Sequence, residues 1–126
     1  MKKIFVGFFL VLLFTGCTKE SLKTETPKGA NNTLSCSDME KKVESGALLI
    51  DVREEEDYNE EHMDNAINIP ISQIEEKIGD YAKKKSTTII LYCETGVRAN
   101  QTAIKLTEMG YTNVYSLGGI RKCKKQ

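Results

Sequence analysis

The hydrophobic positions of this chain follow two alternating spacings, and each spacing predicts one kind of element. Short continuous runs of β-branched and other apolar residues predict buried strands at residues 47–52, 65–70, 86–93 and 113–117. The run "STTIILYC" at 86–93 is the most apolar of these and is therefore expected at the centre of a sheet. Pro70 ends the second run, because proline cannot donate to a strand ladder.

The segments between these runs have the spacing of helices. Residues 37–46 begin with a capping box of Ser37 and Glu40, and Gly46 is expected to end the helix. Residues 53–61 are acidic and predict a helical turn or two. Residues 71–85 predict a helix with lysines in its last turn and with one apolar face made by Ile71, Ile74, Ile78 and Tyr81. Residues 98–110 predict a helix that Gly110 ends, with Ala99, Ala103 and Leu106 facing inward and Ile104 as a further candidate.

Strands that alternate with helices at this spacing predict βαβ units. With a short first strand before Cys36, the fold class is α/β, a small parallel five-stranded sheet with helices on both faces. We expect one domain over residues 34–126, which is long enough for a real core.

The first residues are predicted to direct export and to lie outside the folded domain. "MKKIFVGFFLVLLF" has two lysines and then an apolar run that is too short to span a bilayer, as in a secretory signal peptide. "LFTGC" resembles the bacterial lipobox, which implies a signal peptide over residues 1–16 and a lipid on Cys17. The alternatives are an ordinary secretory signal or a permanent single-span anchor.

A polar segment over residues 17–33 predicts a flexible tether between the lipid and the domain. The expected location is therefore the bacterial cell envelope, on the periplasmic face or the cell surface, with the membrane as a partner through Cys17. The formal net charge is zero, which gives no reason to expect a nucleic-acid partner.

Cys93 stands at the carboxyl end of the most apolar strand, where parallel sheets bind ligands. The next helix directs its N-terminus to this point and favours an anion there, such as a thiolate. Gly96 permits a tight loop, and Arg98 adds a positive charge. From these residues alone, Cys93 is a buried packing residue, a disulfide partner, a metal ligand or a nucleophile.

Three ordered motifs resemble the rhodanese family over nearly the whole domain. "LLIDVREEEDYNEEHMDNAINIP" resembles the family's Asp-Val-Arg to Ala-x-Asn-x-Pro signature, "YCETGVRA" its active-site loop, and "GYTNVYSLGGI" its last strand and Gly-Gly turn. The resemblance implies a sulfurtransferase that moves sulfane sulfur from a small anionic donor such as thiosulfate to a thiophilic acceptor. Cyanide and thiols are acceptors of this class, and the acceptor of this chain is unknown.

The resemblance makes Cys93 the nucleophile that carries the sulfur as a persulfide, with ping-pong kinetics. The persulfide-binding loop would be Glu94, Thr95, Gly96, Val97 and Arg98, and Arg98 would orient the donor. The chemistry requires no cofactor and no metal. Glu94 points to solvent or disfavours dianionic donors.

Competing functions differ in their cysteine patterns. Phosphatases of this fold have one residue more between cysteine and arginine than the 94–97 segment provides. Thiol–disulfide oxidoreductases prefer a Cys-x-x-Cys pair, which is absent from the sequence. A non-catalytic sulfur-binding or protein-interaction module is the remaining alternative.

The resemblance also assigns supporting roles. Asp51 and Arg53 are expected to form an ion pair that supports the sheet end, the alternative being contact with substrate. His62 is expected to be structural, the alternative being a catalytic base. The first and last strands are neighbours in the family's sheet, which suggests a disulfide between Cys36 and Cys123, the alternative being two free thiols. The chain departs from the family pattern at four positions, Asp64, Asn65, Ala99 and Cys123.

Overall fold

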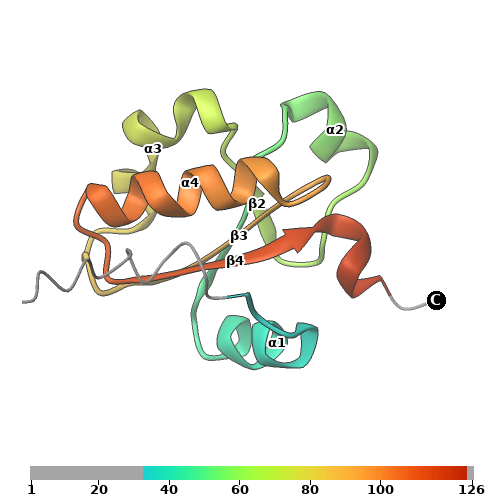
Figure 1. Cartoon of the computed structure of the whole chain (residues 1–126), viewed down its shortest axis with the longest axis horizontal. Coiled ribbons are helices and arrows are strands. Elements are labelled where there is room, and N and C mark those ends of the chain that lie inside the picture. The colour runs from blue at the N-terminus through green and yellow to red at the C-terminus, as the bar shows by residue number, and fades with distance from the viewer. Residues whose placement is uncertain (1–32, 125–126) are drawn as a thin grey trace, which may run out of the picture.

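The computed structural model describes residues 33–124 and contains a four-stranded sheet between two layers of helices (Figure 1). The expected signal peptide, tether and lipid-bearing Cys17 lie outside the described residues. The strands are β1 (Leu48–Asp51), β2 (Ala66–Asn68), β3 (Thr88–Cys93) and β4 (Asn113–Gly119). The α-helices are α1 (Cys36–Glu44), α2 (Glu55–Glu60), α3 (Ile74–Tyr81) and α4 (Val97–Glu108), and two 3-10 turns are η1 (Ile71–Gln73) and η2 (Ile120–Cys123).

All strand pairs are parallel, in the order β2-β1-β3-β4. The strongest predicted strand, β3, is central as expected, because its residues from Ile89 to Cys93 are buried on both faces of the sheet. Parallel pairing brings the carboxyl ends of β1, β3 and β4 to one edge. Asp51 pairs with Tyr92, and Cys93 pairs with Gly119, so the chemistry-bearing residues of three strands meet there.

The predicted α/β class and the parallel sheet are confirmed, but the count of five strands is wrong for the described part of the chain. The segment before Cys36 contributes one isolated parallel bridge, between Thr33 and Ser116 of β4. The Leu34 N–H donates to the Ser116 carbonyl at 3.4 Å, and Ser35 then caps helix α1. A strand cannot extend past Leu34, because the chain turns into the helix at the next residue.

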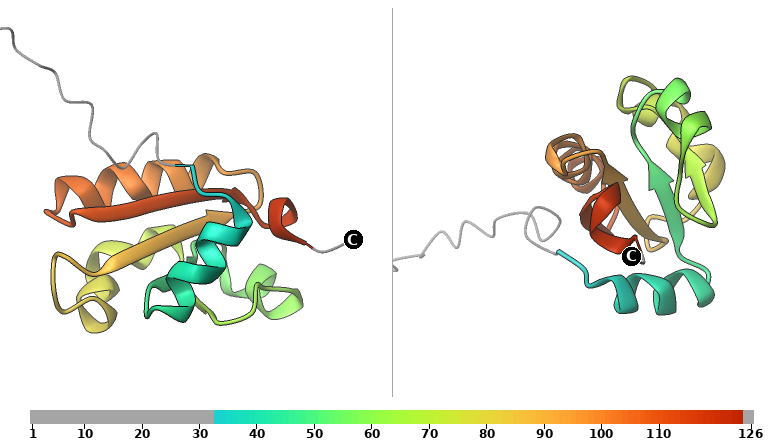
Figure 2. Two further views of the ribbon diagram at one scale, coloured as in Figure 1. Left: turned by 90° about the horizontal axis from the view of Figure 1, so that it is seen from below. Right: turned by 90° about the vertical axis from the view of Figure 1, so that its right-hand side faces the viewer.

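Helices cover both faces of the sheet, as predicted (Figure 2). Helices α3 and α4 bury Ile74, Ile78, Ala103 and Leu106 against one face. Helix α1 and turn η2 cover the other face, where Met39 and Ile120 pack on Tyr92 and Leu117. Of the helices in residues 33–124, none is long and apolar enough to cross a membrane.

The predicted start of the first helix is wrong by two residues. Ser35, not Ser37, is the N-cap, since its backbone is extended and its Oγ accepts the Asp38 N–H at 3.2 Å. Asp38 thus occupies the position that Glu40 was expected to fill. Two overlapping Ser-x-x-acid patterns were available, and the earlier one lies beside the Thr33–Ser116 bridge.

The predicted apolar faces of α3 and α4 are partly wrong. Tyr81 is 48% exposed, because helix α3 ends there and Tyr111 covers the same end of the core, donating its hydroxyl to the Ala82 carbonyl. The lysines at 83–85 lie beyond the helix instead of in its last turn. Ile104 is exposed, because Thr102, Ala103 and Leu106 form the buried face of α4.

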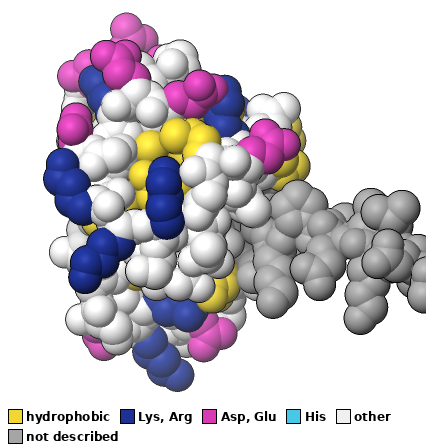
Figure 3. Space-filling view, turned by 90° about the vertical axis from the view of Figure 1, so that its left-hand side faces the viewer, with side chains coloured by type: hydrophobic (Ala, Val, Ile, Leu, Met, Phe, Trp, Pro, Cys, Tyr) yellow, Lys and Arg dark blue, Asp and Glu magenta, His cyan; other side chains and the backbone are white. Residues whose placement is uncertain are grey.

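This end of the molecule carries an apolar patch with basic side chains around it (Figure 3). Lys85, which follows α3, places its Nζ 4.0 Å from the centre of the Tyr111 ring, a cation–π contact. The patch lies at the amino ends of the strands, and the candidate site lies at the opposite edge of the sheet (Figure 1).

Cys36 and Cys123 form a disulfide with a Cα–Cα distance of 5.4 Å. It joins the first turn of α1 to the end of η2 across a sequence separation of 87 residues. The bond therefore fastens the two ends of the described domain to each other, on the face of the sheet that α1 covers.

Loss of this disulfide is expected to lower the stability of the domain. A bond that closes so long a loop restricts the unfolded chain, so a Cys36→Ser, Cys123→Ser double variant should lose about 2–5 kcal/mol of unfolding free energy. Urea unfolding followed by circular dichroism measures this. The parent chain in reductant should match the double variant, and equal stabilities of oxidised parent and variant would contradict the prediction.

Candidate active site

The candidate site is centred on Cys93, the last residue of β3. Its side chain is 1% exposed, and its sulfur accepts the Gly96 N–H at a distance of 3.0 Å. Within the described part of the chain Cys93 is the only free cysteine. A free sulfur that accepts a backbone N–H three residues later is placed to hold negative charge.

The loop after Cys93 connects β3 directly to α4. Gly96 is the N-cap of α4 and has a φ of 100°, a left-handed conformation that residues with a Cβ rarely adopt. The first N–H groups of any helix have no intrahelical partner, and in α4 no side chain caps them. The positive end of the helix dipole therefore faces the loop. Glu94, Thr95 and Val97 are exposed, so the loop lies at the surface of the molecule.

Two glycines at the end of β4, Gly118 and Gly119, pack directly against the backbone of this loop. A Cβ on Gly119 would lie 2.4 Å from the carbonyl oxygen of Glu94, and a Cβ on Gly96 would lie 3.2 Å from the Cα of Gly118. The two backbones are therefore in direct contact, with no room for a side chain between them. The sequence suggests this only indirectly, since a glycine pair at a strand end indicates close backbone approach.

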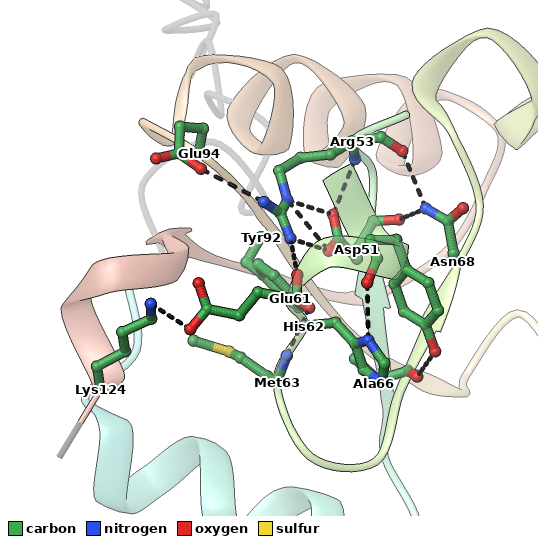
Figure 4. A network of polar contacts seen from close by, with 11 residues as sticks. Asp51, Arg53, Glu61, His62, Met63, Ala66, Asn68, Tyr92, Glu94 and Lys124 are labelled. Carbon is green, nitrogen blue, oxygen red and sulfur yellow. Dashed lines mark hydrogen bonds and ion pairs between the residues drawn. The ribbon is translucent and has the colours of Figure 1, made fainter. Parts of the chain in front are cut away.

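Asp51 and Arg53 form the ion pair that the sequence suggested, at the carboxyl end of β1 (Figure 4). The Arg53 Nη2 lies 2.8 Å from Asp51 Oδ2, and its Nε lies 3.1 Å from both carboxylate oxygens. The backbone N–H of Arg53 also donates to Asp51 Oδ1, at 2.9 Å. Hydrogen bonding to this carboxylate, against the opposing effect of burial, raises the pKa of Arg53.

The same arginine fastens the segment that follows α2. Its Nη2 donates to the Glu61 carbonyl at 2.6 Å, and Asn68 donates its side-chain amide to the carbonyls of Asp51 and Arg53. Arg53 is therefore a buried hub between β1, β2 and the segment before β2. Removal of one partner of such a buried pair leaves an uncompensated charge and is strongly destabilising.

Glu94 lies between two arginines instead of pointing freely to solvent. Its Oε2 is 3.4 Å from Arg53 Nη1, and its Oε1 is 3.4 Å from Arg121 Nε on η2. The carboxylate thus connects the β1 hub to η2 (Figure 4 shows the contact with Arg53). The sequence contained no signal for the contact with Arg121, which depends on how η2 packs.

Arg98 lies in the first turn of α4 and is half-buried. No carboxylate between residues 33 and 124 forms an ion pair with its side chain. Its guanidinium is therefore not neutralised by a described carboxylate, and its role toward an anionic donor stays a prediction.

His62 takes part in local packing. Its ring stacks on Tyr58 with 3.9 Å between centroids, and its Nδ1 hydrogen-bonds the Tyr58 carbonyl at 2.8 Å. The phenol of Tyr58 donates to the Ala66 carbonyl at 2.7 Å. These contacts stabilise the segment before β2, and His62 takes part in them as a packing residue.

Tyr92 was missed as a supporting residue. Its ring is fully buried, and its hydroxyl accepts the Met63 N–H at 3.0 Å. Burial raises the pKa of its phenol, so the hydroxyl stays neutral at physiological pH. Tyr92 directly precedes Cys93, and its hydroxyl therefore ties the end of β3 to the segment after α2 that Arg53 also contacts.

Three of the four departures from the family pattern have a defined structural setting, and nothing in the structure explains Asp64. Asn65 has a φ of 64°, a left-handed conformation that asparagine tolerates better than most residues and that glycine otherwise supplies. Cys123 is half of the disulfide. Ala99 belongs to the buried face of α4, in the same core cluster as Ala103.

The part of the chain that the structure describes contains no set of side chains suited to bind a metal ion. No group of three or more histidine, cysteine, aspartate or glutamate side chains there could hold a metal ion. A pocket of about 420 Å³ lies between α1, residues 61–65 and η2, and Cys93 does not line it.

Comparisons with known proteins agree with this geometry. The model of the rhodanese-like domain matches residues 35–126. Over 72 residues the chain is 42% identical to the thiosulfate sulfurtransferase PspE of Escherichia coli K12, covering 57% of this chain and 69% of that protein. Over 74 residues it is 34% identical to the thiosulfate sulfurtransferase GlpE of Coxiella burnetii, covering 57% of this chain and 65% of that protein.

A solved structure described as a rhodanese with anions from E. coli is also similar. The TM-score is 0.56 at 37% identity, covering 61% of this chain and 91% of that chain. The chain thus spans about two thirds of the length of the two curated relatives and is homologous to thiosulfate sulfurtransferases. From its fold and from these matches, the chain belongs to the family of rhodanese-like domains.

Proposed function

We propose that this chain is a sulfurtransferase that moves sulfane sulfur from donors such as thiosulfate to a thiophilic acceptor, through a persulfide on Cys93. The observation that carries the proposal is the free sulfur of Cys93 at the end of β3, which accepts the Gly96 N–H at 3.0 Å. Homology to two thiosulfate sulfurtransferases supports the same reaction class.

The reaction has two steps that balance without a cofactor. The Cys93 thiolate attacks the outer sulfur of thiosulfate, the sulfur–sulfur bond of the donor breaks, and sulfite leaves with the bonding pair. The acceptor, cyanide or a thiolate, then attacks the outer sulfur of the persulfide and restores the Cys93 thiolate. Covalent catalysis thus divides one transfer into two displacements.

The surroundings of Cys93 suit the anions of both steps. The Gly96 N–H and the open end of α4 stabilise negative charge on the sulfur, and Arg98 orients the anionic donor. The Asp51–Arg53 pair and the Gly118–Gly119 contact hold the loop in shape before the donor arrives. Donors pre-aligned in this way lose less entropy on reaction.

A mass measurement tests the persulfide directly. Thiosulfate should add one sulfur atom to the full chain, at Cys93, and cyanide should then remove it as thiocyanate. Cys93→Ser should show neither the label nor turnover, because a serine hydroxyl is not ionised at neutral pH.

A full chain that takes up the label but releases no thiocyanate or persulfidated thiol would favour a sulfur-binding module over an enzyme. A chain that takes up no label from several sulfane donors would contradict the proposal. The cysteines of the disulfide provide the internal control, since they should remain unlabelled in the oxidised protein.

Gly119→Ala is expected to slow the reaction by displacing the loop. The added Cβ would lie 2.4 Å from the Glu94 carbonyl, so the loop must shift, at a cost of about 1–3 kcal/mol. We expect a fall in both kcat and stability, measured by thiocyanate release and thermal unfolding. Gly79→Ala is the matched control, since nothing lies near its Cβ position, and equal activities of the two variants would contradict the prediction.

We also propose that the mature protein is exported and anchored to the cell envelope by lipid on Cys17. The lipobox-like "LFTGC" supports this, and the Cys36–Cys123 disulfide suits an oxidising compartment. In a bacterial host, the membrane fraction should contain the protein with a diacylglycerol-bearing Cys17 at its N-terminus. Cys17→Ala should lack the lipid in intact-mass analysis, and a parent protein whose Cys17 carries no lipid would refute the anchor.

A further inference from the structure

Glu94 is an unusual neighbour for a cysteine that reacts with anions, because it places a carboxylate directly after the nucleophile. The structure gives this carboxylate two partners, Arg53 and Arg121, each at 3.4 Å. The three side chains differ in exposure: Arg53 is 6% exposed, Glu94 is 44% exposed and Arg121 is 82% exposed. The contacts therefore run from the buried hub at β1 out to the surface.

The charges of this group cancel. Asp51 and Glu94 each carry one negative charge, and Arg53 and Arg121 each carry one positive charge, so the four side chains sum to zero. Asp51 already compensates Arg53 at close range through three contacts. Without Glu94, the group would present one net positive charge beside Cys93.

The remaining positive charge at the site is modest. Among residues 33–124, Arg98 is the cation of the 94–98 loop, and no ion pair compensates it. The open N-terminus of α4 adds about half a positive charge. The Cys93 thiolate itself carries one negative charge, so about half a positive charge remains for the donor. That remainder matches one negative charge on a donor better than two.

We propose that Glu94 sets the donor selectivity of the Cys93 site, favouring sulfane-sulfur donors with one negative charge, such as organic thiosulfonates, over the dianion thiosulfate. The inference rests on the proposed sulfurtransferase function and names the donor class for that same site. Glu94 acts through the electrostatic potential at Cys93 and takes no part in bond making.

Both donors react by the same displacement, so charge is the variable that separates them. With an organic thiosulfonate, the Cys93 thiolate attacks the terminal sulfur, the sulfur–sulfur bond breaks, and a sulfinate leaves with the bonding pair. With thiosulfate, sulfite leaves instead. The persulfide on Cys93 is identical in the two cases, and cyanide removes its outer sulfur as thiocyanate.

The test compares methanethiosulfonate and thiosulfate as donors for the full chain, with cyanide as acceptor. Because the two donors differ in intrinsic reactivity, the informative quantity is the change in their kcat/KM ratio on substitution. Glu94→Gln removes one negative charge with little change of shape. It should raise kcat/KM about fourfold for each negative charge on the donor, hence about fourfold for methanethiosulfonate and about sixteenfold for thiosulfate.

Salt separates this electrostatic effect from a structural one. The Debye length falls from about 10 Å at 0.1 M to about 3 Å at 1 M, so the fourfold change of the ratio should shrink toward one at high salt. A change of loop shape would alter the ratio equally at both salt concentrations.

Three further variants serve as controls. Glu94→Asp keeps the charge and should keep the ratio of the parent chain. Arg121→Gln removes a positive charge from a largely exposed position and should lower the thiosulfate-to-methanethiosulfonate ratio, the opposite sign. Glu75→Gln removes a carboxylate that pairs with Lys105, about 12 Å along α4 from its first residue, and should leave the ratio unchanged.

The outcomes separate this inference from the function on which it rests. A parent chain that transfers sulfur from neither donor contradicts the proposed function. A parent chain that uses both donors, with the same ratio in Glu94→Gln, Arg121→Gln and Glu75→Gln, overturns the selectivity and leaves the function in place. If Glu94→Gln does not fold, the opposite shift expected for Arg121→Gln still decides the matter.

Discussion

The candidate site depends on the close approach of two backbone segments, the loop after β3 and the glycine pair at the end of β4. The Glu94 carbonyl occupies the space where a Cβ of Gly119 would stand, and the loop then turns at Gly96 so that its N–H reaches the Cys93 sulfur. A parallel sheet brings the two strand ends together, since Cys93 pairs with Gly119. The sulfur is therefore held by backbone geometry, which needs no reorganisation when charge develops.

Charged side chains reinforce this backbone contact from two sides. Arg53, fixed by Asp51, contacts Glu94 from the β1 side, and Arg121 contacts it from η2. Turn η2 ends at Cys123, which the disulfide joins to the first turn of α1. Covalent bond, ion pairs and backbone contact thus form one continuous chain of interactions from the start of the described domain to the residue after the nucleophile.

This arrangement separates the tasks of stability and chemistry. The buried pair of Asp51 and Arg53 is hydrogen-bonded internally, and Arg53 also donates to the Glu61 carbonyl, so the pair maintains the shape of this region. Arg98 is the loop cation that no described carboxylate compensates, and in the proposed reaction it is the group that meets the anionic donor. Glu94 contributes to both tasks. Its backbone belongs to the loop after Cys93, and its carboxylate contacts Arg53 and Arg121.

Much of the fold could be read from local pattern, for local reasons. The apolar run of β3, the helical spacing of α4 and the glycines that end α1 and α4 are dictated by short-range sterics and burial. The ordered motifs around Asp51, Cys93 and Gly118 also indicate the family without reference to any tertiary contact. The errors lie where tertiary contacts override local pattern: Tyr111 covers the core end assigned to Tyr81, and Ser35 caps a helix assigned to Ser37.

Residue spacing within single segments was enough to predict the order of the elements, the parallel α/β class and the placement of Cys93 between a strand end and a helix start. Three features became visible only in the folded structure. Gly119 packs against the Glu94 carbonyl, Glu94 lies between Arg53 and Arg121, and Thr33 makes one bridge instead of a fifth strand. Those contacts join segments far apart in the chain, and no local spacing encodes a distance between them.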